Sequence, residues 1–298
     1  MEANLKQYNP HKNFSDIGFV LLSIGGGIFI GAAFGLVGSF IYLAIVFPVV
    51  MGIVGGIIIT KNAKSLKTRN VFLVTLASVL TVIALYITFH YIRYTGFWVR
   101  GALQVFGDFS YKSIEAGKIV VNYALKKETG YSGFIGYMLY RAQQGVSIGR
   151  LFRSDGLNLG PIFTWVYWLA EFGLIGYLTI SNGKQILEKR FCEHCNSWYS
   201  EKEHIGSAPF NKETEILNSI KLKDFASVGA LLEKDTESPS FEFYLQKCST
   251  ACEKGDTFLS VSLVNFLKGR LISKDISEIT LKPIEKKLFT EKISFLKN

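Results

Sequence analysis

The chain alternates between long apolar stretches and polar connections, and this pattern predicts membrane-spanning helices. Residues 17–60 contain no Lys, Arg, Asp or Glu over 44 positions. A single helix of that length would measure about 66 Å at about 1.5 Å per residue, whereas a bilayer core is about 30 Å thick. The run therefore predicts a hairpin of two spans.

Two further apolar stretches predict two more spans. Residues 71–89 are uncharged, and residues 161–180 carry Glu171 as their one charged side chain. Pro48 falls inside the second span, where it predicts a kink. The four predicted spans are residues 17–37, 41–60, 71–94 and 160–183.

The polar parts of the chain complete the predicted organisation. We expect an α-helical integral membrane protein with four transmembrane helices and a C-terminal α+β soluble domain. The predicted parts are residues 1–94 (the N-terminal segment and first three spans), 95–159 (a helical loop), 160–183 (the fourth span) and 184–298 (the soluble domain). Within the loop, Ser110–Glu128 and Gly133–Gln144 have the composition of short helices closed by glycine.

Basic residues beside the spans indicate their orientation, because cytoplasmic flanks carry more Lys and Arg than outer flanks. With the N-terminus inside, nine basic residues lie in cytoplasmic flanks: Lys6, Lys12, Lys61, Lys64, Lys67, Arg69, Lys184, Lys189 and Arg190. Four flank the outer ends: Arg93, Arg100, Arg150 and Arg153. We therefore expect a multi-pass protein of a bacterial inner membrane, with both termini cytoplasmic and residues 95–159 outside.

The net charge of +9 belongs mainly to the membrane part. Residues 1–183 carry a net charge of +8, whereas residues 184–298 carry +1. A nucleic-acid-binding domain is expected to concentrate basic residues, and the soluble domain does not. The charge distribution therefore favours contact with anionic lipid over binding of nucleic acid.

Glycines recur every four residues in the first two spans. Gly27, Gly31 and Gly35 share one helical face, as do Gly52 and Gly56. Faces without side chains let helix backbones approach closely. The face can form a homo-oligomer seam or a pore-lining hairpin, but packing of the first two spans on each other is the preferred interpretation.

Glu171 is the candidate functional residue of the membrane part. A carboxylate in mid-span is costly, at roughly 2.5–3.5 kcal/mol on insertion scales, so it should face the bundle interior and have a partner. Thr75, Ser78 and Thr81 form a polar stripe on the third span that could supply that partner. Glu171 either handles protons or cations, or is a structural hydrogen-bonding group; the structural role is favoured.

All four cysteines of the chain lie in the soluble domain, in two closely spaced pairs. Cys192 and Cys195 are separated by two residues, and Cys248 and Cys252 by three. Both gaps suit zinc ligation. Residues 241–247 and 257–264 alternate in polarity around the second pair, as in a β-hairpin.

This arrangement resembles the zinc-ribbon class, in which two cysteine knuckles hold one structural zinc. The resemblance covers about residues 190–265 and implies that Cys192, Cys195, Cys248 and Cys252 are the ligands, with His194 and His204 as substitutes. Two disulfides, a redox dithiol or unrelated buried thiols are the alternatives. A cytoplasmic location disfavours disulfides, and no βαβ unit surrounds the first pair, as a thioredoxin-like motif requires.

No enzyme motif is present in the sequence, so we expect a protein that is not an enzyme. Phosphate-binding loops, dinucleotide fingerprints and paired-histidine protease motifs are all missing. A membrane scaffold or assembly component, whose zinc-ribbon-like domain docks a protein partner, is the preferred function. A channel or transporter subunit that uses Glu171 is the first alternative, and a thiol-redox membrane protein is the second.

Overall fold

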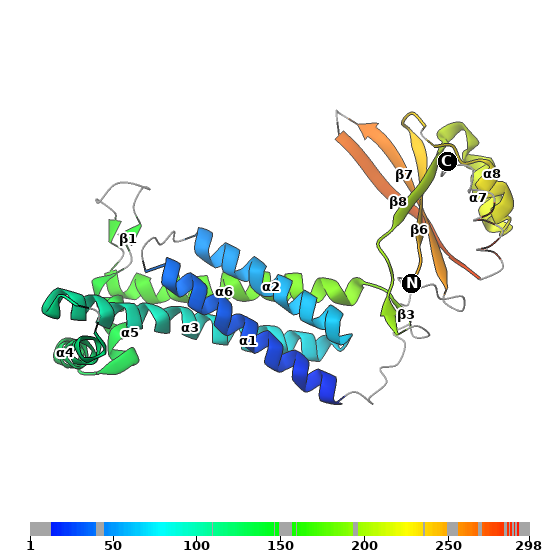
Figure 1. The fold of residues 1–298 in the computed structure, drawn as a ribbon. Helices are drawn as coiled ribbons and strands as arrows, with labels where there is room; N and C mark the ends of the chain where they lie inside the picture. The colour runs from blue at the N-terminus through cyan, green and yellow to red at the C-terminus, as the bar shows by residue number, and fades with distance from the viewer. Residues whose placement is uncertain are drawn as a thin grey trace. The chain divides into compact units, whose positions relative to one another are not determined.

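The chain folds into two compact units, Met1–Glu188 and Lys189–Asn298, in a computed structural model (Figure 1). Each unit has its own hydrophobic core, so the chain consists of two separately packed parts. The structure describes residues 13–39, 45–108, 110–145, 147–148, 157–158, 160–192, 196–234, 236–248, 256–267, 270–282, 285, 287, 289 and 291.

The first unit contains four long apolar helices, as predicted. They are α1 (Asn13–Val37), α2 (Val46–Leu66), α3 (Val71–Phe106) and α6 (Gly160–Lys184), and a one-turn 3-10 helix η1 (Gln185–Glu188) follows the last. Each of the four is long and apolar enough to cross a membrane. Large apolar side chains face outward along them; Phe29, Phe72 and Ile162, for example, are 73%, 73% and 77% exposed.

The helix α3 extends twelve residues beyond its predicted end at residue 94. Asn70 caps its start by accepting hydrogen bonds from the backbone N–H groups of Phe72 (2.9 Å) and Leu73 (3.3 Å). Its end is set by Gly107, which has a φ of 75°. Arg93 and Arg100 interrupt the apolar pattern without ending the helix, because arginine is a good helix former.

Pro48 does not lie in the interior of a helix, contrary to the expected kink. The described part of α2 begins at Val46, so Pro48 lies in the first turn. Backbone N–H groups of a first turn have no acceptor within the helix, so proline costs no hydrogen bond there. The expectation was wrong because it started the span at residue 41.

The glycine ladder of α1 packs against α3. A Cβ added at Gly27 would lie 2.6 Å from the carbonyl oxygen of Thr81, and one added at Gly31 would collide with the carbonyl oxygen of Leu85. The preferred interpretation, that this face packs on the second span, is therefore wrong. The helix α1 touches α2 by a neighbouring face instead, where Gly26 meets Ile58.

The glycines of α2 pack against α6. A Cβ added at Gly52 would lie 2.7 Å from the Cβ of Leu178, and one added at Gly56 would collide with the Cβ of Asn182. The Thr179 hydroxyl donates a hydrogen bond of 3.2 Å to the Gly52 carbonyl across this contact. Both glycine faces are thus covered within one chain, which leaves neither of them open to a second copy.

Two shorter helices pack beside the second half of α3, where the sequence indicated helices. They are α4 (Tyr111–Thr129) and α5 (Gly133–Gln144), followed by the paired two-residue strands β1 (Ser147–Ile148) and β2 (Leu157–Asn158). Ser110 caps α4, and Gly130 ends it with a φ of 79°. Tyr94, Leu125 and Tyr137 form the buried centre of this group.

The second unit contains an antiparallel four-stranded sheet of order β5-β6-β7-β8. Its strands are β5 (Glu203–Pro209), β6 (Ser240–Gln246), β7 (Thr257–Leu267) and β8 (Arg270–Leu281). The predicted hairpin of residues 241–247 and 257–264 is confirmed as β6 and β7, with Ser240 opposite Val264. A small hairpin of β3 (Phe191–Cys192) and β4 (Ser197–Trp198) comes before the sheet.

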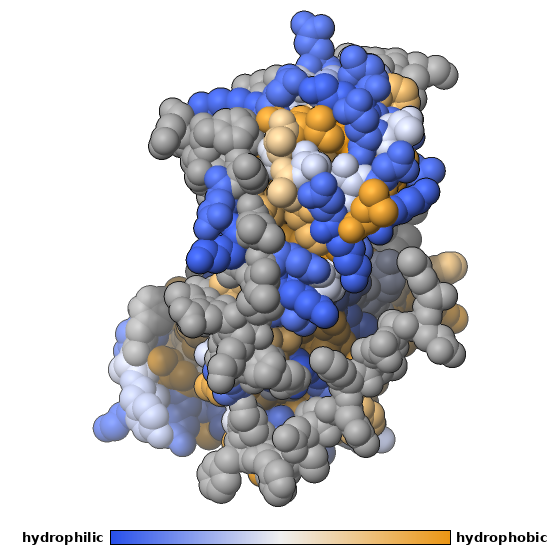
Figure 2. Space-filling model, turned by 90° about the vertical axis from the view of Figure 1, so that its right-hand side faces the viewer, coloured by the Kyte–Doolittle hydropathy of each residue, from blue (hydrophilic) through white to orange (hydrophobic). Residues whose placement is uncertain are grey.

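Two short helices supply apolar side chains to the core of this unit. The 3-10 helix η2 (Phe210–Lys212), α7 (Glu213–Lys221) and α8 (Phe225–Ala230) connect β5 to β6. Ile216, Phe225 and Val228 from these helices join Phe241, Phe243, Leu259 and Val261 of the sheet in one buried cluster. Figure 2 shows hydrophilic residues, with smaller groups of hydrophobic residues between them, on the described surface that faces the viewer.

Candidate functional site

One cysteine from each pair lies beside Tyr199, at the end of the sheet. Cys192 ends β3 opposite Ser197 of β4. The chain then continues from β4 along the end of β6, where Tyr199 and Cys248 form an antiparallel backbone bridge. Next to it, the Ser200 N–H donates a hydrogen bond of 2.8 Å to the Lys247 carbonyl. This backbone pairing brings together two cysteines that are 56 residues apart in sequence.

Both described thiols interact with the Tyr199 hydroxyl. Burial raises the pKa of the Tyr199 phenol, and the charges and hydrogen bonds of the Cys248 and Cys192 thiols raise it further. Cys192 and Cys248 are 3% and 8% exposed. The Tyr199 ring in turn packs on Phe258, with ring centroids 5.2 Å apart, and the Arg190 guanidinium lies 3.9 Å above the same Phe258 ring.

Two of the four sulfur donors that the sequence suggests for zinc, Cys192 and Cys248, are described at this end of the sheet. Buried sulfur ligands from two short-gap pairs are the usual set of a structural zinc site, and a hydroxyl that donates to thiolates is a typical outer partner. Cys195, Cys252 and His194 lie outside the described residues. Accordingly, the described residues alone contain no group of three or more His, Cys, Asp or Glu placed to hold a metal.

His204, the other substitute ligand, has a different partner in the structure. It lies on β5, where its side chain forms an ion pair with Glu242 of β6 and its ring lies 5.4 Å from that of Tyr244. The His204 side chain is 42% exposed. We therefore assign His204 to the open face of the sheet.

Glu171 is buried in the four-helix unit, as the sequence predicted. It is 2% exposed and lies on the face of α6 that packs against α3. The Tyr86 hydroxyl donates a hydrogen bond of 3.3 Å to the Glu171 carboxylate and also lies 3.2 Å from the Trp168 carbonyl oxygen. The carboxylate therefore joins α6 to α3.

The polar stripe expected to pair with Glu171 does not supply its partner. The Thr75 hydroxyl donates to the Val71 carbonyl (2.8 Å), and the Ser78 hydroxyl donates to the Val74 carbonyl (2.7 Å). The Thr81 hydroxyl is buried without a hydrogen bond in the described structure. Hydroxyls in helices readily bond to the carbonyl one turn earlier, which is why the stripe predicted the wrong partner.

His90 adds a second titratable side chain to this group. Its ring centroid lies 4.6 Å from that of Tyr86 and 5.5 Å from that of Trp168. The side chain is 4% exposed, and its Nε2 has no hydrogen-bond partner within the described residues. Tyr86 and His90 are four residues apart and share one helical face, a spacing that could have indicated them from the sequence.

No protein-family model, curated protein or solved structure matches the chain.

Proposed function

We propose that this protein is a multi-pass membrane scaffold whose C-terminal unit docks a protein partner. The helices α1, α2, α3 and α6 cross the bilayer in this proposal, and both termini are cytoplasmic. The outward apolar side chains of the four helices support insertion, because such surfaces on soluble proteins are rarely extensive. A reporter fused after Asn298 that is active only outside the cytoplasm would overturn this orientation.

A structural zinc on Cys192, Cys195, Cys248 and Cys252 is proposed to close the C-terminal unit. The proximity of Cys192 and Cys248 through Tyr199 supports this ligand set. Four thiolates fill a tetrahedral zinc and leave no position for a substrate. The metal therefore has a folding role in this proposal, and the unit acts by binding.

The edge of β8 is the observation that carries the docking proposal. At the opposite edge of the sheet, Ser207 of β5 exchanges backbone hydrogen bonds of 2.9 and 2.7 Å with Glu233. Among the described residues, β8 pairs with β7 alone; eleven of its twelve residues have a partner in this register, and Ile276 lies at a bulge. Ile272 and Ile276 on this edge strand are 50% and 40% exposed.

An open edge strand of this length suits an extended peptide partner. Unpaired backbone groups on such an edge accept a further strand, and side chains at alternate positions give specificity. Lys274 and Asp275 between the two isoleucines discourage nonspecific pairing of identical edges, since charged residues on an edge strand oppose aggregation. The proposed partner therefore contributes a strand with apolar positions that match Ile272 and Ile276.

Site-specific photo-crosslinking in cells tests this function. A crosslinking side chain at Ser273 of β8 should give one discrete protein adduct, and the same probe at Leu222, which is 80% exposed after α7, should not. The adduct should weaken in an Ile272→Lys, Ile276→Lys variant. Equal adducts from Ser273 and Leu222, or none from Ser273, would contradict docking at β8.

Proton or cation handling is the second candidate function, and the Glu171, Tyr86 and His90 group favours it. Buried ionisable side chains within spans often mark proton or ion paths. Two titratable groups beside one tyrosine are better suited to this role than the lone carboxylate inferred from sequence. Proton uptake into liposomes that contain the purified protein distinguishes this function from a scaffold.

A further inference from the structure

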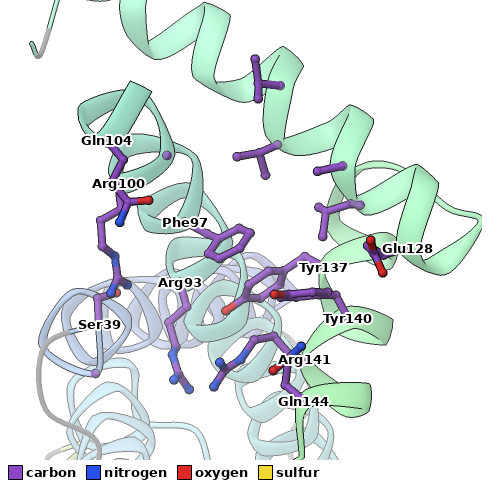
Figure 3. Close-up of a pocket in the computed structure, with 16 residues that line it drawn as sticks. Ser39, Arg93, Phe97, Arg100, Gln104, Glu128, Tyr137, Tyr140, Arg141 and Gln144 are labelled. Carbon is purple, nitrogen blue, oxygen red and sulfur yellow. The ribbon is translucent and has the colours of Figure 1, made fainter. Parts of the chain in front are cut away.

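A cavity of about 800 Å³ lies between the second half of α3, α4 and α5, beside Gly38 and Ser39 at the end of α1. Three arginines line it, from α3 and α5. In Figure 3, the guanidinium groups of Arg93 and Arg141 extend toward the same side of the cavity. The positive charges of these two residues are therefore concentrated on this side.

The charges of two of these arginines, Arg100 and Arg141, are not neutralised by a carboxylate of the described residues. The Arg100 Nε–H donates a hydrogen bond of 3.3 Å to the Gly96 carbonyl. The Arg93 guanidinium lies 5.4 Å from the centroid of the Phe89 ring. Glu128 also lines the cavity, from α4, and Figure 3 shows it on the far side of Tyr140 from Arg93.

Apart from Glu128, the wall formed by α4 is apolar. It presents Val120, Val121, Ala124 and Leu125 to the cavity, and Val120 is 46% exposed. Aromatic rings of Phe97, Tyr137 and Tyr140 line the space between this wall and the arginines. A ligand that fills the cavity therefore needs an anionic group at one end and a hydrocarbon part at the other.

The cavity begins beside an aromatic belt on the helices. Tyr91 and Trp165 are 45% and 47% exposed. Trp165 contacts Trp168, which contacts His90, with ring centroids 5.0 and 5.5 Å apart. Exposed Tyr and Trp mark the headgroup level of a bilayer, and Arg93 lies within one helical turn of His90. The arginines are thus placed at the depth of lipid phosphates.

We propose that this cavity binds an anionic phospholipid, with its phosphate on Arg93, Arg100 and Arg141 and hydrocarbon along α4. Guanidinium groups suit phosphate because they donate two parallel hydrogen bonds. This inference rests on the proposed membrane insertion but not on the docking of a protein partner. Lipid binding is tested by mass spectrometry and docking by photo-crosslinking, so one proposal can fail without the other.

Native mass spectrometry of the full chain in neutral detergent provides the test. The protein is titrated with dioleoyl phosphatidylglycerol and with dioleoyl phosphatidylcholine, which share hydrocarbon chains and differ in net charge. We expect the anionic lipid to bind about 10-fold more tightly than the zwitterionic one, and Arg100→Gln and Arg141→Gln each to weaken it about 10-fold. Lys127→Gln removes the same charge from α4 outside the cavity and should change neither affinity.

Three outcomes would overturn the proposal. Equal binding of both lipids would show that the protein recognises hydrocarbon alone. A loss of affinity in Lys127→Gln equal to that in the arginine variants would show that only the net charge of the protein matters. Inorganic phosphate that binds alone as tightly as the lipid and displaces it would assign the site to a free anion. If the arginine variants do not fold, Ala124→Trp tests the same cavity by filling it, and unchanged lipid affinity there would also reject the proposal.

Discussion

The hydroxyl of Tyr86 on α3 donates a 3.3 Å hydrogen bond to the carboxylate of Glu171 on α6. The same hydroxyl lies 3.2 Å from the Trp168 carbonyl, so one tyrosine connects two helices at two points. A buried polar group without a partner costs about 1–3 kcal/mol, which gives Tyr86 and Glu171 structural value whether or not Glu171 titrates.

The Glu171→Gln variant separates structure from proton handling. A glutamine oxygen accepts the hydrogen bond from Tyr86 as the carboxylate does, so we expect the thermal unfolding midpoint in detergent to stay close to that of the wild type. Glu171→Leu removes one of the two acceptors of the Tyr86 hydroxyl and leaves the Trp168 carbonyl, so stability should fall by about 0.5–1.5 kcal/mol. If Glu171→Gln folds normally but abolishes the cellular phenotype or proton uptake, Glu171 titrates in function.

Alanine substitutions at two glycines of α1 test the helix seam. An alanine at Gly31 places a Cβ against the Leu85 carbonyl, and also 2.9 Å from the Thr88 Cβ, whereas a Cβ at Gly25 meets nothing within 4 Å. We expect Gly31→Ala to destabilise the protein by about 1–3 kcal/mol. Gly25→Ala should be neutral or stabilising by up to about 1 kcal/mol, because alanine favours helix.

Thermal unfolding in detergent compares the two variants under one condition. Both variants make the same chemical change in the same helix, so a difference between them reports the contact with α3. Equal midpoints for Gly31→Ala and Gly25→Ala would show that α1 does not pack on α3 through its glycines.

The number of long helices could be predicted from the sequence, because about 20 apolar residues are a sufficient signal for a span. Their pairing could not. Gly27 and Gly31 identify a face for close packing but not the helix that meets it. The extension of α3 past residue 94 was missed because Arg93 and Arg100 end the apolar run while the backbone remains helical.

The sheet was only partly predictable for a related reason. The strands β6 and β7 alternate in polarity around a buried face, and this pattern indicated them. In β8, Lys274, Asp275 and Glu278 dilute the apolar residues, because the edge strand is exposed along most of its length. The spacing of the cysteines identified two pairs, but the position of Tyr199 between Cys192 and Cys248 depends on long-range pairing of the backbone.

Loss of one thiolate should unfold part of the C-terminal unit. We expect the unit, expressed as residues 184–298, to contain one equivalent of zinc and to lose it, with part of its β-structure, in Cys195→Ser and Cys248→Ser. A structural zinc contributes roughly 10 kcal/mol or more of apparent binding free energy in small domains. His194→Ala should be silent. Elemental analysis and circular dichroism measure both quantities, and a folded, reduced sample without zinc would favour the thiol-redox alternative.

Tyr199→Phe tests the outer partner of the proposed zinc site. Its hydroxyl interacts with the thiols of Cys248 and Cys192, and a donor of this kind stabilises thiolate charge on a bound metal. Loss of such a partner costs about 10–100-fold in metal affinity, while the ring that packs on Phe258 remains. We therefore expect Tyr199→Phe to keep one zinc and its fold but to release the metal to a chelator at about 10-fold lower chelator concentration.

Tyr244→Phe is the matched control for this prediction. Tyr244 lies on β6 of the same unit, and its ring contacts His204 on the open face of the sheet. Tyr244→Phe removes one phenol hydroxyl, as Tyr199→Phe does, but away from the cysteine thiols. We therefore expect it to release zinc at the same chelator concentration as the wild type. If both variants release zinc alike, Tyr199 has no specific effect on the metal. If only Tyr199→Phe releases zinc early, the backbone pairing of Tyr199 with Cys248 places the hydroxyl where the metal affinity depends on it.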